Sequence, residues 1–270
     1  MTRFAADTAV TRAEPGRYTA TIDEGWWIER GPNGGYLAAI VLRAILAEVD
    51  DPTRRPRSLT LHYLRPPAAG PCEVAVSVER SGRGLTTVSA RLTQGGRPCI
   101  IALSALGVAR PGPELHDHPA PSVPAADTLD PPARPATAGP DIPFRRRYET
   151  RPAIGTAPFE RGPAAETGGW IRPSDSDPVD DVLLVALTDA WPPALFSRLE
   201  APVGVPTVEL TIHLRGEPSG RPGWCLVRFR TLLVEDGYLE ESGEVWSEDG
   251  RLLAESRQLA LLLAPELSPR

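Results

Sequence analysis

An aspartate in an apolar setting is the first residue of this sequence that could do chemistry. Asp189 follows the run 182–188, which is apolar enough to be the buried part of a helix over residues 179–191. Pro192 and Pro193 end that helix, so Asp189 should lie in its last turn, where the helix dipole disfavours a carboxylate by about 0.3–1 kcal/mol. Apolar surroundings raise the pKa of a carboxyl group, so Asp189 could act as a general base. The structural alternative is an aspartate that pairs with an arginine or caps a backbone amide.

A glutamine in the last predicted strand is the second candidate. Alternate residues of a strand share one face, and Gln258 shares its face with Ala254, Ser256 and Ala260. The opposite face carries charged residues, so the face of Gln258 is expected to point inward. A buried amide without partners costs roughly 1–3 kcal/mol. Gln258 therefore either ties down a backbone loop or serves a function.

A threonine at the start of an earlier strand is the third candidate. Thr207 opens a strand predicted over 205–215, directly after the loop that follows the Asp189 helix. Threonine is common in strands, and Thr211 is a rival that the period of two places on the same face. We favour Thr207 because it follows the helix-to-strand loop.

Composition limits the class of protein to which these residues belong. The 270 residues are 41% hydrophobic and 24% charged, as in an ordinary soluble protein, and the net charge of −6 argues against nucleic acid or an anionic membrane as the partner. Neither a signal peptide nor an apolar run of membrane-span length is present, so we expect a cytoplasmic protein. Cys72, Cys99 and Cys225 lack metal-type spacing, so we expect buried free thiols and no metal or organic cofactor.

The chain contains an internal repeat. Residues 59–62 (Leu-Thr-Leu-His) are echoed by 210–213 (Leu-Thr-Ile-His), and the turn at 94–97 is echoed by the turn at 248–251. The stretch between Gly107 and Arg145 contains ten prolines, which favour an extended, irregular connector. The predicted parts are an N-terminal unit (1–108), a proline-rich linker (109–144) and a C-terminal unit (145–270) that carries most of the candidate residues.

Each half shows one apolar helix followed by four strands. The first helix, 34–49, is apolar nearly all round and should therefore be buried. Its strands are expected near 57–65, 72–80, 84–94 and 97–107, and those of the second half near 205–215, 224–235, 238–248 and 251–263. One buried helix followed by an antiparallel meander suggests a sheet that curls around the helix.

That arrangement resembles the hot-dog fold, and its duplicated form resembles the acyl-CoA thioesterase II (TesB-like) family. The resemblance rests on Gly31-Pro32-Asn33-Gly34-Gly35-Tyr36 at the start of the first helix, on Leu-Thr-x-His after it, and on the three polar positions of the second half. It implies an α+β double hot-dog, two fused units in which an antiparallel sheet wraps a long buried helix. We expect edge strands of the two units to pair, because pairing removes an aggregation liability.

The resemblance also implies an activity, the hydrolysis of acyl-CoA thioesters to free acid and CoA. Asp189 would take a proton from a water molecule that Thr207 and Gln258 hold for attack on the thioester carbonyl. Asn33, Gly34 and Gly35 would bind substrate, with the glycine amides as donors to the developing oxyanion. The structural alternative for these glycines is a tight entry turn. A dimer of double hot-dogs is one option for the oligomeric state.

Two other functions remain open. A hot-dog hydratase acting on an enoyl or 3-hydroxyacyl thioester would resemble this fold, but such enzymes use a histidine near the helix start, where this chain has Asn33. His62 and His213 occupy equivalent strand positions in the repeat, so we interpret them as structural. A non-catalytic acyl-thioester-binding protein is the second alternative. The acyl chain length and the carrier, CoA or acyl-carrier protein, cannot be read from the sequence, and neither can the arginines that would meet the CoA phosphates.

Overall fold

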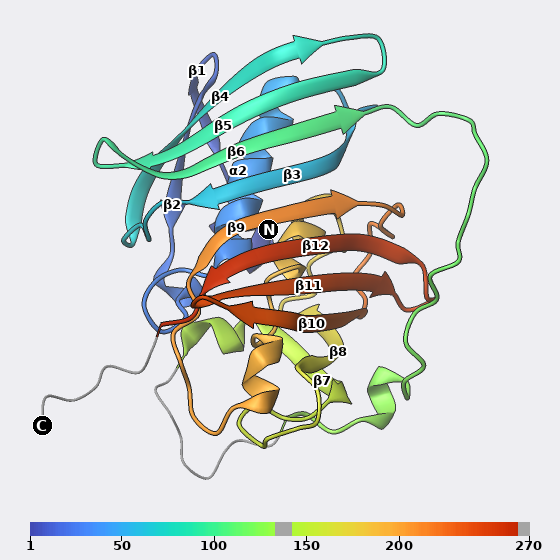
Figure 1. Ribbon diagram of the computed structural model, residues 1–270. Coiled ribbons are helices and arrows are strands. Elements are labelled where there is room, and N and C mark those ends of the chain that lie inside the picture. Colours follow the sequence, from blue (N-terminus) through green and yellow to red (C-terminus); the bar gives the residue numbers. More distant parts are fainter. Residues whose placement is uncertain (133–141, 264–270) are drawn as a thin grey trace, which may run out of the picture.

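The computed structural model describes residues 1–132 and 142–263; the parts of the predicted linker and C-terminal unit at 133–141 and 264–270 lie outside them. The strands of the described residues form one 12-stranded sheet in the order β1-β2-β4-β5-β6-β3-β9-β12-β11-β10-β8-β7 (Figure 1). The N-terminal half contains α1 (Arg3–Asp7), β1 (Thr11–Glu14), β2 (Arg17–Ile22), η1 (Glu24–Trp26), α2 (Gly34–Val49), β3 (Arg55–Tyr63), β4 (Gly70–Ser81), β5 (Leu85–Gln94) and β6 (Arg97–Gly107). The C-terminal half contains η2 (Ala126–Thr128), η3 (Pro143–Arg146), β7 (Tyr148–Gly155), β8 (Glu166–Pro173), α3 (Asp181–Leu187), η4 (Ala194–Arg198), β9 (Thr207–Leu214), β10 (Cys225–Glu235), β11 (Tyr238–Ser247) and β12 (Leu252–Leu261).

The two halves meet at a seam between β3 and β9. These strands are the edges of their own halves, and they pair antiparallel from Ser58 opposite His213 to His62 opposite Glu209. On the outer face of the sheet, the hydroxyls of Thr60 and Thr211 lie 3.0 Å apart across the seam. The predicted pairing of edge strands is therefore confirmed, and the α+β double hot-dog is the observed architecture.

Helices α2 and α3 lie behind the sheet in Figure 1, and their buried residues belong to the main hydrophobic core. Asn33 caps α2 by accepting a hydrogen bond from Tyr36 N at 2.9 Å, and the helix ends where Asp50 adopts a left-handed conformation. Asp180 caps α3 in the same way, through Leu183 N at 2.7 Å. Residues 35–42, 44 and 45 of α2 and residues 182–187 of α3 are buried, and the two helices pack against each other within a core shared by both halves.

Helix α3 is shorter than the sequence predicts, with seven residues in place of the expected span 179–191. The Thr188 hydroxyl donates to Val185 O at 2.8 Å. The amides of Asp189 and Ala190 bond to carbonyls only three residues back, which is the pattern of a tighter, 3₁₀-type turn. Asp189 therefore lies just beyond the helix rather than in its last turn, and that prediction is wrong.

Four strands were missed by the sequence analysis. In β2 the alternation of Tyr18, Ala20 and Ile22 with exposed residues was present but short. In β8 the adjacent Gly168 and Gly169 obscured the strand, although both are needed because neighbouring backbones approach them closely. These strands extend each meander by one hairpin at its outer edge.

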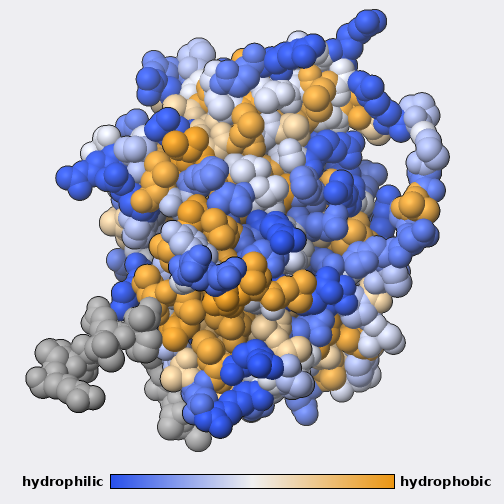
Figure 2. Space-filling view, viewed as in Figure 1, coloured by the Kyte–Doolittle hydropathy of each residue, from blue (hydrophilic) through white to orange (hydrophobic). Residues whose placement is uncertain are grey.

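The described part of the proline-rich connector packs against the second half. Residues 109–125 form neither helix nor strand, as expected. Trp170 Nε1 donates to Pro124 O at 2.8 Å, and His118 lies 2.8 Å from a carboxylate oxygen of Glu244 on β11. The side chains of Leu232, Leu233 and Leu259 in the second half are exposed. Figure 2 shows an apolar area below its centre.

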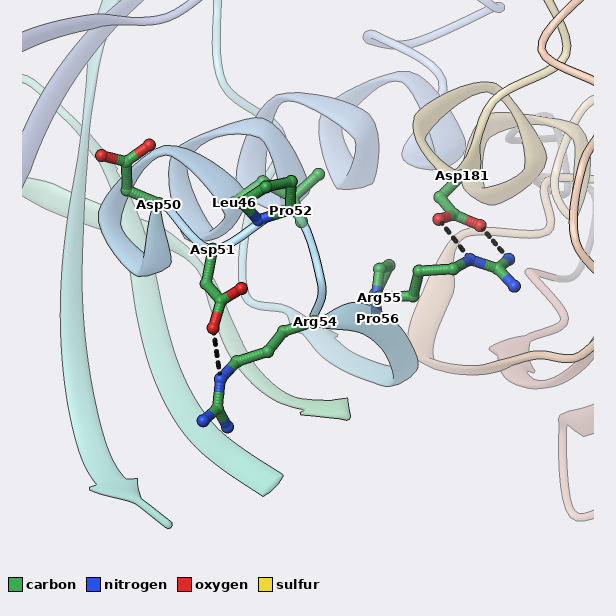
Figure 3. Close-up of a pocket in the computed structure, with 8 residues that line it drawn as sticks. All are labelled: Leu46, Asp50, Asp51, Pro52, Arg54, Arg55, Pro56 and Asp181. Atoms are coloured by element: carbon green, nitrogen blue, oxygen red, sulfur yellow. Dashed lines mark hydrogen bonds and ion pairs between the residues drawn. The ribbon is translucent and has the colours of Figure 1, made fainter. Parts of the chain in front are cut away.

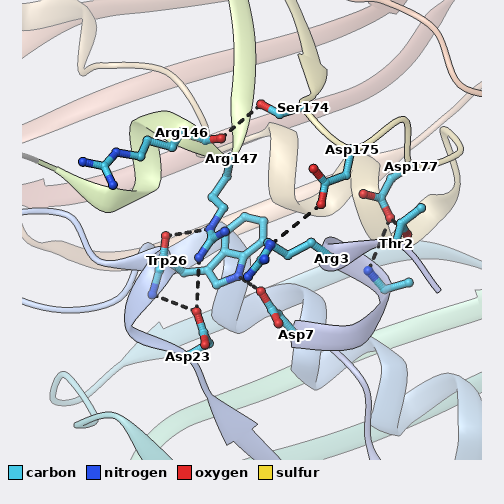
Figure 4. Close-up of polar contacts among 12 residues, drawn as sticks. Thr2, Arg3, Asp7, Asp23, Trp26, Arg146, Arg147, Ser174, Asp175 and Asp177 are labelled. Carbon is cyan, nitrogen blue, oxygen red and sulfur yellow. Dashed lines mark hydrogen bonds and ion pairs between the residues drawn. The ribbon is translucent and has the colours of Figure 1, made fainter.

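The N-terminal segment connects the halves at a second place (Figure 4). Arg147 donates to Gly25 O at 2.9 Å, lies 3.3 Å from Asp23 Oδ1 and stacks over the ring of Trp26. Trp26 is itself stacked on Tyr36 of α2 with ring centroids 4.8 Å apart, so this contact reaches the helix core.

Two further expectations concern thiols and membranes. The thiols of Cys72, Cys99 and Cys225 are free and buried, as predicted. Within the described residues, the helices are too short or too polar to cross a bilayer.

Candidate active site

Asp189 reaches from the end of α3 to the beginning of α2. Its Oδ2 accepts hydrogen bonds from Gly35 N at 2.8 Å and Asn33 Nδ2 at 2.9 Å, and Asn33 Nδ2 also donates to Asp189 O at 2.7 Å. A Cβ atom on Gly34 would lie 2.9 Å from Oδ2, and one on Gly35 would lie 2.5 Å from Ala186 O. Glycine is therefore required at both positions for the carboxylate to approach the helix start, where backbone amides favour an anion.

The surroundings of Asp189 make it more basic than an ordinary aspartate. Burial raises its pKa to about 6, against the opposing effect of the hydrogen bonds from Gly35, Gly34 and Asn33. The carboxylate does cap a backbone amide, which is the structural alternative considered above. The hydrogen bonds from Gly35 N and Asn33 Nδ2 end on Oδ2. A base whose pKa lies near neutrality is well matched to general-base catalysis.

Thr207 and Gln258 lie in direct contact. Gln258 is buried on the inward face of β12, and its Nε2 donates to Thr207 Oγ1 at 2.6 Å. A bulge in β9 makes this contact, because Thr207 pairs with Ala260 while Glu209 pairs with Leu259, which leaves Val208 as an extra residue. The bulge turns Thr207 to the inward face.

The same bulge separates Thr207 from its rival. Thr211 points to the outer face, where it contacts Thr60 across the seam and donates to Glu209. The expectation that Thr207 and Thr211 share a face is wrong, because the period of two does not hold across a bulge. His62 and His213 are exposed on the outer face as well, on the opposite side of the sheet from Gln258.

The amide of Gly35 is occupied in this structure. Sequence reasoning assigned the Gly34 and Gly35 amides to the oxyanion, but Gly35 N donates to Asp189. The start of a helix attracts the nearest anion, and here that anion is the protein's own carboxylate. Asn33 is likewise used to cap α2 and to hold Asp189.

The elements that carry the two groups of candidate residues pack against each other. Helix α3, which leads to Asp189, packs against β9 and β12, the strands of Thr207 and Gln258. Glu241 of β11 pairs with Gln258 in the sheet, and the charge of Asp189 contributes to the raised pKa of Glu241. Tyr63 at the end of β3 donates to Gly34 O at 2.9 Å, and a Cβ atom on Gly34 would touch both Tyr63 and Asp189.

Tyr63 and Glu241 were missed by the sequence analysis, although each carried a signal. In β3, Leu59, Leu61 and Tyr63 share the inward face, so a phenol follows two buried leucines. In β11, Glu241 takes an inward position between buried Leu239 and Gly243. An ionisable side chain at an inward strand position could have been found by the argument that identified Gln258.

Comparison with known proteins identifies the family. A model of the acyl-CoA thioesterase N-terminal domain matches residues 22–107, and one of the acyl-CoA thioesterase C-terminal domain matches residues 122–262. The chain belongs to the acyl-CoA thioesterase family. The second match includes Asp189, Thr207 and Gln258, and the first includes Asn33, Gly34 and Gly35.

Solved thioesterase-like structures share the whole architecture. A protein of unknown function with a hot-dog fold from Alicyclobacillus acidocaldarius is 26% identical, with a TM-score of 0.89 over 98% of this chain and 99% of that one. A protein of Thermobifida fusca assigned as a thioesterase II is 31% identical, with a TM-score of 0.83 over 98% of each chain. The acyl-CoA thioesterase II TesB2 of Mycobacterium marinum, at 19% identity, has the same fold with a TM-score of 0.77 over 97% of this chain and 99% of that one.

A pocket of about 390 Å³ lies at the other end of α2 from Asp189 (Figure 3). Arginines at such a pocket are candidates for contact with the CoA phosphates, and the sequence left open which arginines these are. Arg54 instead donates to Asp51 at 2.8 Å, and Arg55 donates to Asp181 at 2.6 Å. Both guanidinium groups are largely buried and already paired with carboxylates.

Proposed function

We propose that this member of the acyl-CoA thioesterase family hydrolyses acyl-CoA to free acid and CoA, with Asp189 as the general base. The observation that carries the proposal is a buried carboxylate that Gly35 and Asn33 hold at the start of α2, directly after a helix that packs against the strands of a hydrogen-bonded threonine and glutamine. Burial raises the pKa of this carboxylate to about 6. Such a base is ionised at neutral pH, yet it accepts a proton more readily than an ordinary aspartate.

The attacking water would span the gap between the carboxylate and the threonine–glutamine pair. Asp189 Oδ1 takes one proton of the water, and Thr207 with Gln258 fixes its oxygen for attack on the thioester carbonyl. A tetrahedral intermediate then expels the CoA thiolate. General-base assistance of this kind is worth typically about 10²–10⁴-fold in rate.

The oxyanion needs donors, and the start of α2 supplies the candidates. We propose that Asn33, Gly34 and Gly35 bind the substrate carbonyl in the reactive complex, after Asp189 Oδ2 has released Gly35 N. Gly35 N and Asp189 Oδ2 lie 2.8 Å apart, so the proposed oxyanion donor and the proposed base are neighbours in this structure.

The competing functions lack supporting observations. A hydratase would need a histidine near the helix start, and Asn33 stands there, committed to capping α2. A non-catalytic binder would have no use for an aspartate whose pKa is raised to about 6, together with a hydrogen-bonded threonine–glutamine pair. Both alternatives make distinct predictions in the test below.

Partners and location belong to the same proposal. The substrate is acyl-CoA, and we propose that the protein acts in the cytoplasm without a cofactor. We also propose that two copies of the chain associate as a dimer of double hot-dogs, with the exposed side chains of Leu232 and Leu233 in the interface.

The test is a hydrolysis screen with the purified protein over CoA thioesters from short to long chain length. We expect release of free CoA thiol with at least one chain length, together with stoichiometric free acid. Hydration of an enoyl-CoA without thiol release would support the hydratase instead. Saturable binding of every thioester without turnover would support the binding protein.

A further inference from the structure

Glu241 is a buried carboxylate to which the proposed mechanism gives no role. It is 6% exposed on β11, and its Oε2 accepts the backbone amide of Ala194 at 2.5 Å. Thr231 Oγ1 of β10 lies 3.5 Å from the same oxygen. Both donors are uncharged, which is an unusual environment for an ionised carboxylate.

Its position links the two parts of the candidate active site. Ala194 begins η4, five residues after Asp189, so the Glu241 side chain fastens the loop that carries the base to the sheet. Across the β11–β12 ladder, Glu241 is the direct partner of Gln258. Directly paired side chains have Cβ atoms about 4.5–5.5 Å apart, so a carboxyl group at 241 can reach the amide oxygen of Gln258.

The charged groups around Glu241 oppose its ionisation. Burial is the largest cause that raises the pKa of Glu241, to about 8. The negative charges of Asp189 and of Glu240 raise it further. Glu240 pairs with Arg257 on the outer face at 3.0 Å. The groups that β12, β10 and η4 contribute around Glu241 are uncharged: Gln258, Thr231 and the Ala194 amide. At neutral pH the side chain is therefore mainly an uncharged acid, which can donate as well as accept a hydrogen bond.

We propose that Glu241 is a positioning residue of the thioesterase site, which as a neutral acid anchors the Asp189 loop and holds the amide of Gln258 against Thr207. The inference rests on the proposed function. One carboxyl oxygen accepts the Ala194 amide, and the O–H of the other oxygen donates to the Gln258 amide oxygen. Nε2 of Gln258 is then fixed toward Thr207, where its 2.6 Å hydrogen bond is observed.

The pH dependence follows from the same geometry. When Glu241 ionises, it can no longer donate to Gln258, and it adds a second negative charge beside Asp189. Turnover of the wild type should therefore decline above about pH 8. Glutamine at position 241 can make both hydrogen bonds and cannot ionise.

The experiment compares Glu241→Gln and Glu241→Leu with the wild type, using the acyl-CoA that the wild type hydrolyses fastest. We expect Glu241→Gln to keep the neutral-pH kcat within about threefold and to lose the alkaline decline. Glu241→Leu should lower kcat by about tenfold or more with KM little changed, because the catalytic groups lose their alignment. Glu255→Gln, which removes an exposed carboxylate paired with Arg215 on the outer face, is the matched control and should behave as wild type at every pH.

The outcomes separate this inference from the proposed function. Three outcomes would overturn the role of Glu241 and leave thioester hydrolysis standing. They are a wild-type kcat in Glu241→Leu, a loss of kcat in Glu241→Gln as large as that in Glu241→Leu, and an alkaline decline of kcat that persists in Glu241→Gln. A wild type that hydrolyses none of the thioesters would overturn the proposed function and this inference with it. Should Glu241→Leu fail to fold, the pH profile of Glu241→Gln decides alone.

Discussion

At the scale of single residues, the comparison between Thr207 and Thr211 shows how one extra residue in a strand decides a side chain's role. Both are threonines of β9, but the bulge at Val208 places Thr207 against Gln258 and leaves Thr211 on the outer face. Thr207→Ala should lower kcat by about tenfold or more, since the water loses a hydrogen-bond partner.

Thr211→Ala is the matched control for that prediction. It removes the same hydroxyl from the same strand and breaks the contact with Thr60, so it should cost about 0.5–1.5 kcal/mol in unfolding free energy with kcat unchanged. Steady-state kinetics and thermal melts on both variants measure the difference. A larger loss of kcat in Thr211→Ala than in Thr207→Ala would refute the assignment.

What the sequence could predict at this scale was the type of residue rather than its partners. Gln258 was found because its face of β12 is apolar, and the structure buries it. The same pattern argument placed Thr211 wrongly, because a bulge leaves no reliable mark in a single sequence. The occupied Gly35 amide was also beyond reach, since it depends on how closely two helices approach.

At the scale of elements, the close approach of α2 and α3 positions the proposed base. A Cβ atom on Gly35 would lie 2.5 Å from Ala186 O and 3.0 Å from Asp189 Cβ. Gly35→Ala should therefore push the helices apart, lowering stability by about 1–3 kcal/mol despite alanine's higher helix propensity, and reducing kcat by moving Asp189.

Gly82→Ala is the control for this prediction, because a Cβ atom there would meet Leu85 O at an ordinary 3.5 Å. Chemical denaturation and kinetics on both variants provide the measurement. If Gly35→Ala matched Gly82→Ala in both stability and turnover, the close packing of the helices would not be what positions Asp189.

The elements themselves could be predicted where periodicity was long and pure. The bounds of α2 agree with the expected 34–49, and β6 agrees with 97–107. Prediction failed at the end of α3, where Thr188 bonds back to the helix and Asp189 is drawn toward α2. Such ends depend on tertiary partners that a local pattern does not contain.

At the scale of the whole molecule, duplication explains both the fold and the asymmetry of the site. The repeated sequence pattern predicted two equivalent units, and the β3–β9 pairing joins them in one sheet. In the proposed site, the start of the first helix supplies Asn33, Gly34 and Gly35, and the second half supplies Asp189, Thr207 and Gln258. Because the N-terminal segment also crosses to the second half through Arg147, the geometry of the site depends on both units.

Replacement of Asp189 has opposite consequences for catalysis and for stability. The pKa of Asp189 is about 6 in the folded chain and 3.8 for an ordinary aspartate. Below about pH 4 the carboxyl group is protonated in both states, so its burial does not lower the free energy of unfolding. As the pH rises toward 6, the unfolded chain ionises more readily than the folded chain, and the wild type loses stability. Asparagine does not titrate. The melting temperature of Asp189→Asn should therefore rise relative to that of the wild type as the pH increases from about 4 to 6.

The kcat of Asp189→Asn, measured on folded protein at neutral pH, tests the central claim most directly. The substitution keeps the shape of the side chain and removes the proton acceptor, so turnover of acyl-CoA should fall by roughly 10²-fold or more. A folded variant that hydrolyses acyl-CoA at nearly the wild-type rate would contradict the assignment of Asp189 as the base.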